Sequence, residues 1–143
     1  LSRKRTFTFA AADIPSQDPQ LQQVIGRLAS NAYATKAIVL TAAQALQKAV
    51  DHAKNGEVQV EDSHHSALEA AEAKIIVDDL ALQSATLLFE VGGSSAIRKE
   101  NHYDRHWQNI RTIVSHNPNV YKERVIGDYV VNNQDLPINE VYF

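Results

Sequence analysis

Residues 18–53 decide the fold, and they read DPQLQQVIGRLASNAYATKAIVLTAAQALQKAVDHA. The first pair signals a helix start, because Asp18 can cap the first amide groups and Pro19 loses no hydrogen bond at the first helical position. Asn55-Gly56 is a good stop signal. Between them, apolar or small residues recur in steps of four and three, at Leu21, Ile25, Leu28, Ala32, Thr35, Val39, Ala42, Leu46, Ala49 and Ala53. This repeat predicts a long, straight helix packed nearly parallel to its neighbours.

A second long helix is predicted from Asp62-Ser63 to Gly92-Gly93, with Ser66-x-x-Glu69 as a capping box. Asp78 and Asp79 interrupt its apolar pattern, so part of it should meet water or a cation. The helix carries two apolar lines, one through Leu68, Ala71, Ile75, Leu82, Ala85 and Phe89, the other through Ala73, Val77, Leu80, Leu87 and Val91. A helix that is apolar on two faces is buried between partners.

Two short helices should follow. Asp104 can cap a helix over residues 105–115, and Asn117-Pro118 repeats the earlier start signal for a helix over 118–131, which Asn132-Asn133 stops. No β-strand alternation is visible, so we predict an all-α helical bundle of two long and two short helices. These helices bury too little apolar surface by themselves, and we expect helices outside the chain or other subunits to cover them.

Composition places the chain among single-domain globular proteins. It has 143 residues, of which 44% are hydrophobic and 22% are charged. The net charge of -3 argues against a duplex nucleic-acid partner. The absence of cysteine excludes disulfides and thiolate zinc sites. No apolar run reaches the roughly 20 residues that span a membrane, which predicts a cytoplasmic protein. The chain lacks Met and begins at Leu1, so we expect a fragment or a processed product.

Two spacings are compatible with metal binding, but neither is complete. His102-x-x-x-His106 lacks a third ligand and an internal Glu, and the turn signal at Asp104 separates the two imidazoles. Glu61-x-x-His64 occurs once, whereas di-iron bundles need two copies and further Glu residues. We therefore predict no metal site.

Three other groups each have a functional and a structural interpretation. Gly92-Gly93-Ser94-Ser95 could form an anion-binding concavity, or only a helix-ending turn. His116 lies at a break between two helices, where it could move a proton in a pocket or simply pack at a helix end. The helix with Arg105, Trp107 and Asn109 could recognise phosphate or carboxylate, or could be an ion-paired surface helix with one core Trp.

Three strings carry a resemblance to a known family: residues 88–96 (LFEVGGSSA), residues 104–112 (DRHWQNIRT) and residues 115–118 (SHNP). Together they resemble the C-terminal helical domain of the acyl-CoA dehydrogenase superfamily, and more closely its branch of monooxygenases that use reduced FMN, such as the dibenzothiophene monooxygenases. The basic segment at residues 3–7 fits the same pattern. The resemblance covers essentially the whole chain.

The resemblance implies that residues 1–143 are the C-terminal domain of a larger enzyme, with the domain's first helix before Leu1, and that the enzyme is a homo-oligomer, a dimer or tetramer. It also implies a flavin site. Arg3, Arg5 and Phe7 would approach the flavin phosphate of a neighbouring subunit, and Gly92, Gly93, Ser94 and Ser95 would lie along the flavin. His116 would be catalytic beside the flavin, and Arg105, Trp107 and Asn109 would contact or support the substrate.

Two departures from the dehydrogenases decide the expected reaction. Phe7-Thr8 stands where the dehydrogenases have a Phe-Gly pair. These enzymes commonly carry a catalytic Glu in the turn before the last helix, where residues 115–118 offer no carboxylate. The resemblance then implies an oxygenase that oxidises a small organic or sulfur compound with O2, with reduced FMN from a flavin reductase. The alternatives are an acyl-CoA dehydrogenase proper with FAD, and a non-catalytic helical oligomerisation module.

Overall fold

The computed structural model describes residues 10–140 of the chain. Its four α-helices are α1 (Pro19–Asp51), α2 (Val60–Gly92), α3 (Asp104–His116) and α4 (Asn119–Asn132). Short 3-10 helices are η1 (Pro15–Gln17), η2 (Gly93–Ile97) and η3 (Lys99–Asn101). Over the described residues there is no β-strand, only one isolated bridge between Lys54 and Glu57. The predicted all-α bundle of two long and two short helices is confirmed.

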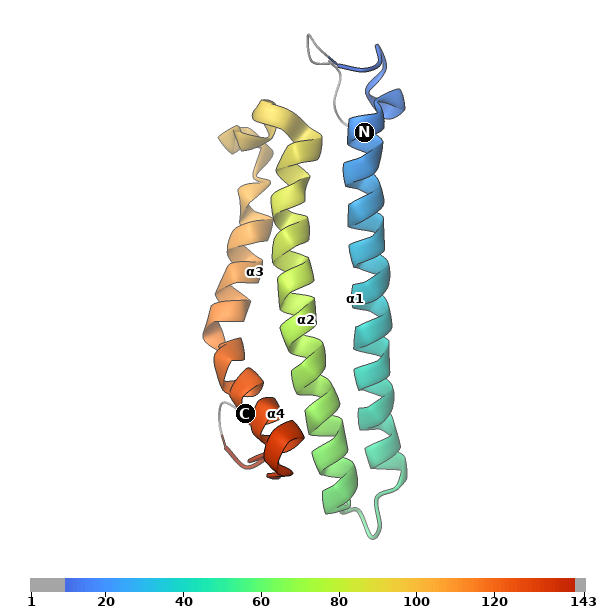
Figure 1. Cartoon of the computed structure of the whole chain (residues 1–143), viewed down its shortest axis with the longest axis vertical. Coiled ribbons are helices and arrows are strands. Elements are labelled where there is room, and N and C mark those ends of the chain that lie inside the picture. The colour runs from blue at the N-terminus through green and yellow to red at the C-terminus, as the bar shows by residue number, and fades with distance from the viewer. Residues whose placement is uncertain (1–9, 141–143) are drawn as a thin grey trace.

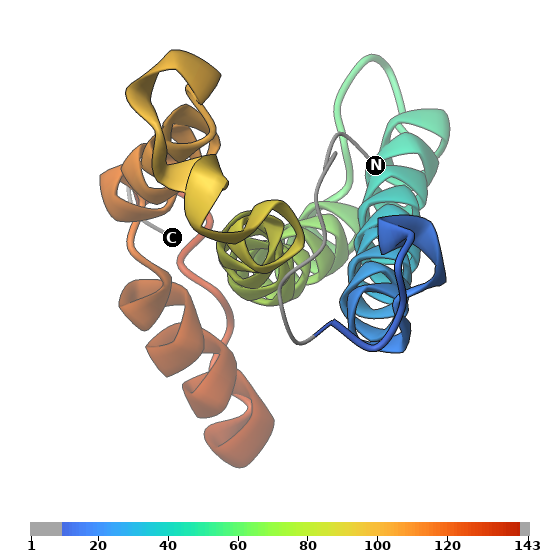
Figure 2. The ribbon, with the colours of Figure 1, turned by 90° about the horizontal axis from the view of Figure 1, so that it is seen from above.

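The long helices form an antiparallel hairpin, and the short helices follow one another along the other side of α2 (Figure 1). Seen from above, α2 lies between α1 on one side and the α3 and α4 pair on the other (Figure 2). All residues of the two apolar lines predicted for α2 are buried or half-buried. This confirms that α2 is the central helix of the chain.

The start of α1 is as predicted. Asp18 is the N-cap, and its Oδ1 accepts a hydrogen bond from the Gln20 N–H at 2.9 Å, with Pro19 as the first helical residue. The helix ends at Asp51, and the chain then turns through Asn55 and Gly56, whose φ angles of 55° and 84° lie in the left-handed region. The predicted stop thus forms the turn that follows the helix.

The seam predicted on α1 is half wrong. Leu21 and Ala49 are buried, but Ile25, Val39 and Leu46 are 36%, 48% and 59% exposed. The positions that are buried or half-buried instead include Val24, Asn31, Ile38 and Ala45. Each of them directly precedes a residue of the predicted seam. An ideal helix turns every 3.6 residues, and α1 has one packed neighbour in this chain, so one narrow stripe is covered and the adjacent apolar residues remain exposed.

The polar interruption of α2 is also explained. Asp78 is 8% exposed, and Lys74, one turn earlier, donates to its carboxylate, so Asp78 meets a cation as expected. Asp79 is exposed. The predicted capping box is wrong, because α2 already begins at Val60, and Ser66 lies inside the helix with its Oγ donating to the Ser63 carbonyl.

Two predicted caps of the short helices are likewise wrong. Asp104 is the first residue of α3, not its cap, and its carboxylate accepts from Gln108 Nε2. Asn117 does not cap α4, which begins at Asn119 after Pro118 in an extended conformation. The stop at Asn133 is confirmed, since its φ of 53° is left-handed.

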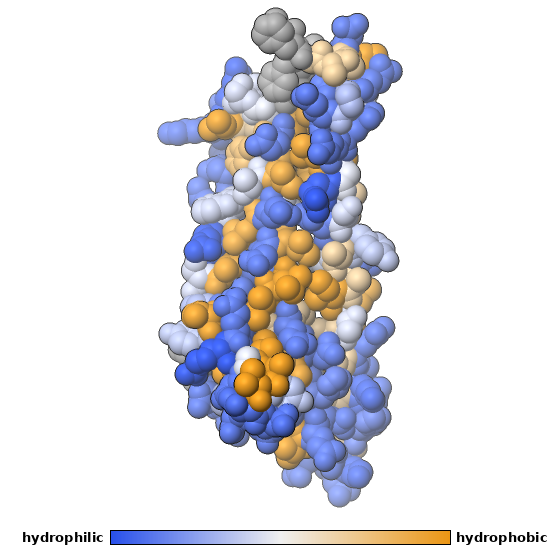
Figure 3. Space-filling view, in the orientation of Figure 1, coloured by the Kyte–Doolittle hydropathy of each residue, from blue (hydrophilic) through white to orange (hydrophobic). Residues whose placement is uncertain are grey.

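Large apolar surfaces remain uncovered. No large side chain among the described residues is fully buried. The space-filling view shows apolar side chains gathered along the face over the middle of the bundle (Figure 3). The exposed apolar residues of α1 and α4 include Ile25, Val39, Leu40, Leu46, Val50, Val120, Val130 and Val131. Exposed apolar side chains that gather on one face of a protein mark surfaces suited to contact other helices.

Candidate functional site

The glycine pair forms the corner at the end of α2. Gly92 is the last helical residue, and a Cβ built on it would lie 2.5 Å from the Cβ of Ala96, which is 2% exposed. Gly93 follows with φ 63° and ψ -165°, a conformation that is essentially restricted to glycine. Its N–H donates to the Phe89 carbonyl and closes the helix. Both glycines are thus required by the turn itself.

The two serines after this corner face solvent. Ser94 and Ser95 lie in η2, and both are exposed. The Ser95 carbonyl accepts from Asn101 Nδ2 at 2.7 Å, which fixes the backbone of the turn. The structure therefore confirms the helix-ending interpretation, and it leaves both hydroxyls accessible to a ligand.

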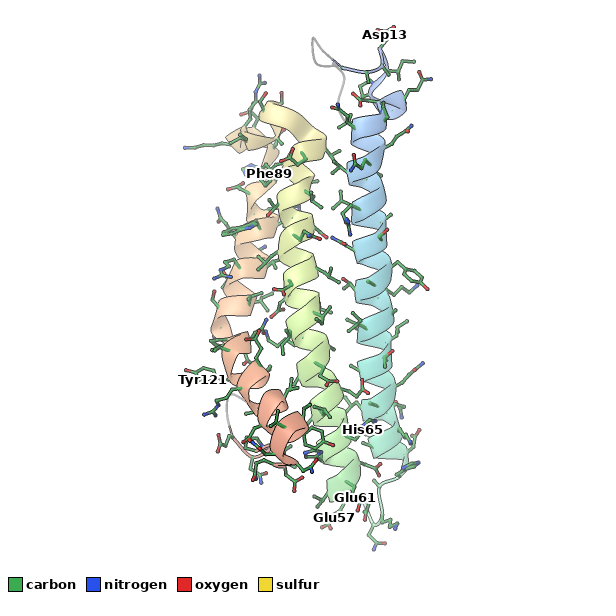
Figure 4. The ribbon with its side chains drawn as sticks, viewed as in Figure 1. Asp13, Glu57, Glu61, His65, Phe89 and Tyr121 are labelled. Carbon is green, nitrogen blue, oxygen red and sulfur yellow. The ribbon has the colours of Figure 1, made fainter. Side chains whose placement is uncertain are left out.

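An apolar cavity of about 380 Å³ lies beside the same end of α2, and its lining residues are Thr86, Phe89, Asp104, Trp107 and Gln108. The figure with side chains shows Phe89 near this end of the helix (Figure 4). Trp107 is 41% exposed, so it is a cavity wall more than a core residue. Arg105 and Asn109 are exposed and one turn apart on α3, and since residues two apart do not share a helix face, Trp107 points away from them.

His116 is the last residue of α3 and is exposed. The backbone leaves the helix at Asn117, with φ -128° and ψ 86°, and continues through Pro118 into α4. An exposed imidazole at a rigid break between helices can reach a ligand that is held by another domain or subunit. An imidazole can act as a hydrogen-bond donor or as a proton acceptor.

A partly buried polar cluster adjoins this break, and of its contacts the sequence indicated only that Asp78 should meet water or a cation. We call it the corner cluster, and it consists of Lys74, Asp78, Asn117, Asn119 and Lys122. Lys74 Nζ donates to the Asp78 carboxylate and, at 2.9 Å, to Asn119 Oδ1. Lys122 Nζ donates to Asn117 Oδ1 at 2.9 Å. The two asparagines flank Pro118, so each side of the break is tied to a lysine.

The electrostatics of the corner cluster are asymmetric. Lys122 is 5% exposed, and its burial, together with the positive charge of Lys74, lowers the pKa of its ammonium group, while Asp78 opposes this effect. Two cations and one carboxylate share the cluster. The amide oxygens of Asn117 and Asn119 add acceptors for the two ammonium groups, as buried charges require.

The structure does not bring all the predicted site residues together. The glycine corner and Trp107 lie at one end of α3, and His116 lies at the other. Trp107 and His116 are nine residues apart in this helix, so at 1.5 Å per residue they are separated by roughly 14 Å along its axis. Arg3, Arg5 and Phe7 lie outside the described residues.

The histidines considered as metal ligands have other roles. His64 Nε2 accepts from the Leu136 N–H at 3.0 Å and so anchors the C-terminal segment against α2. His102 has a left-handed φ of 51° before α3, whereas His106 lies within α3, as the turn signal predicted. Across residues 10–140, no group of three or more His, Cys, Asp or Glu side chains could hold a metal ion. No helix in the same range is long and apolar enough to cross a membrane.

The sequence carries one weak signal of the corner cluster. Lys74 and Asp78 are four residues apart on one helix face, which is the spacing of an ion pair. Asn119 gave no such signal, because its contact with Lys74 depends on how α4 packs against α2. The contact between Lys122 and Asn117 crosses the break between the helices and follows no helical spacing. The tether between His64 and Leu136 spans 72 residues and is equally invisible to local patterns.

Comparisons with known proteins identify the family. The chain is 31% identical over 137 residues to a dibenzothiophene monooxygenase from Mycolicibacterium goodii, covering 96% of the chain and 32% of that protein. It is 26% identical over 134 residues to a probable FMNH2-dependent monooxygenase, SfnC, from Pseudomonas putida, covering 94% of the chain and 33% of that protein.

Two solved structures share the fold. Methanesulfinate monooxygenase MsuC from Pseudomonas fluorescens superposes with a TM-score of 0.86 at 28% identity, over 95% of the chain and 35% of that chain. FMN-bound TdsC from Paenibacillus sp. A11-2 superposes with a TM-score of 0.85 at 26% identity, over 99% and 35%. The chain thus spans about a third of the length of these relatives. Residues 1–120 match the family described as acyl-CoA dehydrogenase, C-terminal domain, and the chain belongs to that family.

Proposed function

We propose that the chain is the C-terminal helical domain of a monooxygenase that uses reduced FMN and O2 to oxidise a small organic or sulfur compound. The observation that carries the proposal is the break between α3 and α4, which presents a histidine and no free carboxylate. The names of the relatives, monooxygenases for dibenzothiophene and methanesulfinate among them, support the same reaction class.

The described residues fit a flavin in two respects. The glycine corner exposes the hydroxyls of Ser94 and Ser95, which can donate to a phosphate or to polar ring atoms. Phe89 and Trp107 offer apolar surface beside the same corner, which suits a planar aromatic ring. In the proposal, residues 92–95 hold the flavin, and Arg3, Arg5 and Phe7 serve its phosphate end from a neighbouring subunit.

When bound, reduced FMN would supply the two electrons that activate O2. The role of His116 is to donate a proton to, or take one from, the reacting oxygen atoms. Its place at the end of α3, before Pro118 with its restricted φ, positions the backbone that carries the imidazole. Because His116 and residues 92–95 lie at opposite ends of α3, they are given separate roles, proton transfer and cofactor binding. Arg105 and Asn109 support the substrate from one face of α3, and Trp107 does so from the cavity on another face.

The corner cluster does not supply the base that a dehydrogenase needs. A base that removes a proton from a thioester must be ionised and must reach the substrate. Asp78 is the carboxylate that the corner cluster holds beneath the break, and it is 8% exposed and paired with Lys74. It is therefore held away from substrate, which favours the oxygenase over the FAD-dependent alternative.

The uncovered apolar faces support a homo-oligomeric enzyme, a dimer or tetramer in the proposal, with a separate flavin reductase as the source of reduced FMN. The exposed residues of α1 lie on a single continuous helix of 33 residues, which is long enough for an extended helix–helix interface.

The test is His116→Ala in the complete enzyme supplied with reduced FMN, O2 and sulfur-containing substrates. Loss of one positioned acid–base group lowers a rate by about 10²–10⁴-fold. We expect that loss in product formation, with unchanged FMN affinity and melting temperature. His106→Ala, which removes another exposed histidine of α3, is the matched control. Oxygenation at the original rate by the His116→Ala enzyme would refute the role of His116.

A further inference from the structure

The corner cluster has no part in the function proposed above, although it contains two of the charged side chains that are buried among the described residues, Asp78 and Lys122. Asp78 and Lys122 are 8% and 5% exposed. Burying charges costs free energy unless every charge is paired and hydrogen-bonded, and apolar residues of similar volume often stabilise a protein as well or better. Stability alone is therefore a weak reason for this cluster.

The targets of the two lysines indicate another reason. Lys74 and Lys122 each bind an asparagine at the break. They donate at 2.9 Å to the side chains of Asn119 and Asn117, the residues on either side of Pro118. One lysine comes from α2 and the other from α4, so the break is tied to two helices at once. His116 immediately precedes the residue bound by Lys122.

We propose that Lys122 and Lys74 are positioning residues for His116: by holding Asn117 and Asn119, they fix the end of α3 so that the imidazole keeps one orientation toward the reacting atoms. The proposal rests on the proposed function for its catalytic consequence. Its structural half, the ordering of His116, stands independently. Lys122 acts through Asn117 and does not itself touch substrate.

The key variant is Lys122→Met, which keeps the length of the aliphatic stem and removes the donor to Asn117. Since Met removes a buried charge, folding should be preserved, while Asn117 loses its partner. Asn117→Ala removes the acceptor of the same hydrogen bond and serves as the second variant if Lys122→Met does not fold. Lys48→Met, which changes an exposed lysine of α1, is the matched control.

Two measurements are made on each variant. Histidine-selective NMR reports the mobility of the His116 ring, and turnover with reduced FMN reports product formed per flavin oxidised. We expect a mobile His116 ring and about a tenfold lower product yield in both corner variants, with unchanged FMN affinity. A displacement of about 1 Å can cost as much as 10²-fold. The double variant, Lys122→Met with Asn117→Ala, should lose no more product yield than the more severe single variant. The reason is that both substitutions remove the same hydrogen bond, the one between Lys122 and Asn117.

The outcomes separate the two proposals. A His116 ring as ordered as in the parent protein, in either folded variant, overturns the positioning role whatever the turnover shows. A mobile ring combined with unchanged turnover supports the positioning of His116 and refutes its catalytic role, so it is the proposed function that fails. A purely structural cluster predicts lower melting temperatures with normal ring order and normal product yield in the folded fraction.

Discussion

Substitution of Gly92 by Ala tests the tightest contact of the fold. Gly92 has helical dihedrals, φ -77° and ψ -21°, so by helix propensity alone alanine would be favoured by about 1 kcal/mol. The new Cβ would lie 2.5 Å from the Cβ of Ala96, however, whereas carbon atoms pack at about 3.5–4.0 Å. The two Cβ atoms must therefore move apart by about 1 Å or more. Ala96 is 2% exposed and has no flexible atoms, so the backbone of η2 must shift.

Overpacking of this kind costs about 1–3 kcal/mol. After subtracting the gain in helix propensity, we expect Gly92→Ala to lose about 0–2 kcal/mol of unfolding free energy. Gly127, inside α4, is the matched control, because a Cβ there meets no atom within 4 Å. Gly127→Ala should gain about 0.5–1 kcal/mol. The two substitutions are chemically identical and are expected to differ in sign.

Thermal unfolding followed by circular dichroism at the helix band measures both. For a chain of this size, 1 kcal/mol corresponds to roughly 3 °C in melting temperature. Ala96→Gly removes the clashing methyl group, so Gly92→Ala should be less harmful in that background than in the parent chain. If Gly92→Ala raises the melting temperature as Gly127→Ala does, the close approach of η2 to α2 is absent and the account of the glycine corner is wrong.

Three further outcomes are expected. Gly93→Val should lower both FMN affinity and stability, because φ 63° with ψ -165° excludes a β-branched residue. Ser94→Ala should lower FMN affinity with unchanged melting temperature. If both folded variants bind FMN as tightly as the parent does, the cofactor role of residues 92–95 is refuted. Sedimentation at micromolar concentration should show self-association, weakened by Leu46→Gln on the exposed face of α1, and a clean monomer would contradict it. Burial holds the pKa of Lys122 in the folded chain below the 10.5 of the unfolded chain, so between these two pKa values the unfolded chain binds more protons. Stability measured in urea should therefore rise with pH in that window relative to Lys122→Met. A stability difference between the two proteins that does not change with pH would contradict the burial of Lys122.

The sequence predicted what depends on local chemistry. Asp18-Pro19 begins α1, the glycine pair ends α2, and Asn133 ends α4, because each uses a conformational preference of one or two residues. The central place of α2 also followed from its two apolar lines, which is a property of the helix alone. These elements needed no knowledge of their partners.

The errors arose where tertiary packing decides. The repeat on α1 contains two adjacent apolar stripes, and the pattern cannot indicate which of them the single neighbour in this chain covers. Val24 and Asn31 turned inward, and Ile25 and Val39 turned outward. Asn31 illustrates the difficulty, because its burial depends on hydrogen bonds to Gln83 and Ser84 on α2, which no local pattern reveals. The candidate site was divided for the same reason, since only the course of α3 separates His116 from the glycine corner.

The two X-Pro pairs show how one local signal can have two outcomes. Asp18 caps α1 with its own side chain. Asn117, before Pro118, does not cap α4. Its Oδ1 accepts a hydrogen bond from Lys122, and α4 begins without a side-chain cap. The second arrangement forgoes a cap worth about 1 kcal/mol and requires a buried lysine. Departures of this kind from local preference tend to occur where a protein needs a fixed geometry. The uncapped start of α4 directly follows His116, and Lys74 binds Asn119 on the other side of Pro118. For these two reasons we regard the break between α3 and α4 as a structure that positions the imidazole.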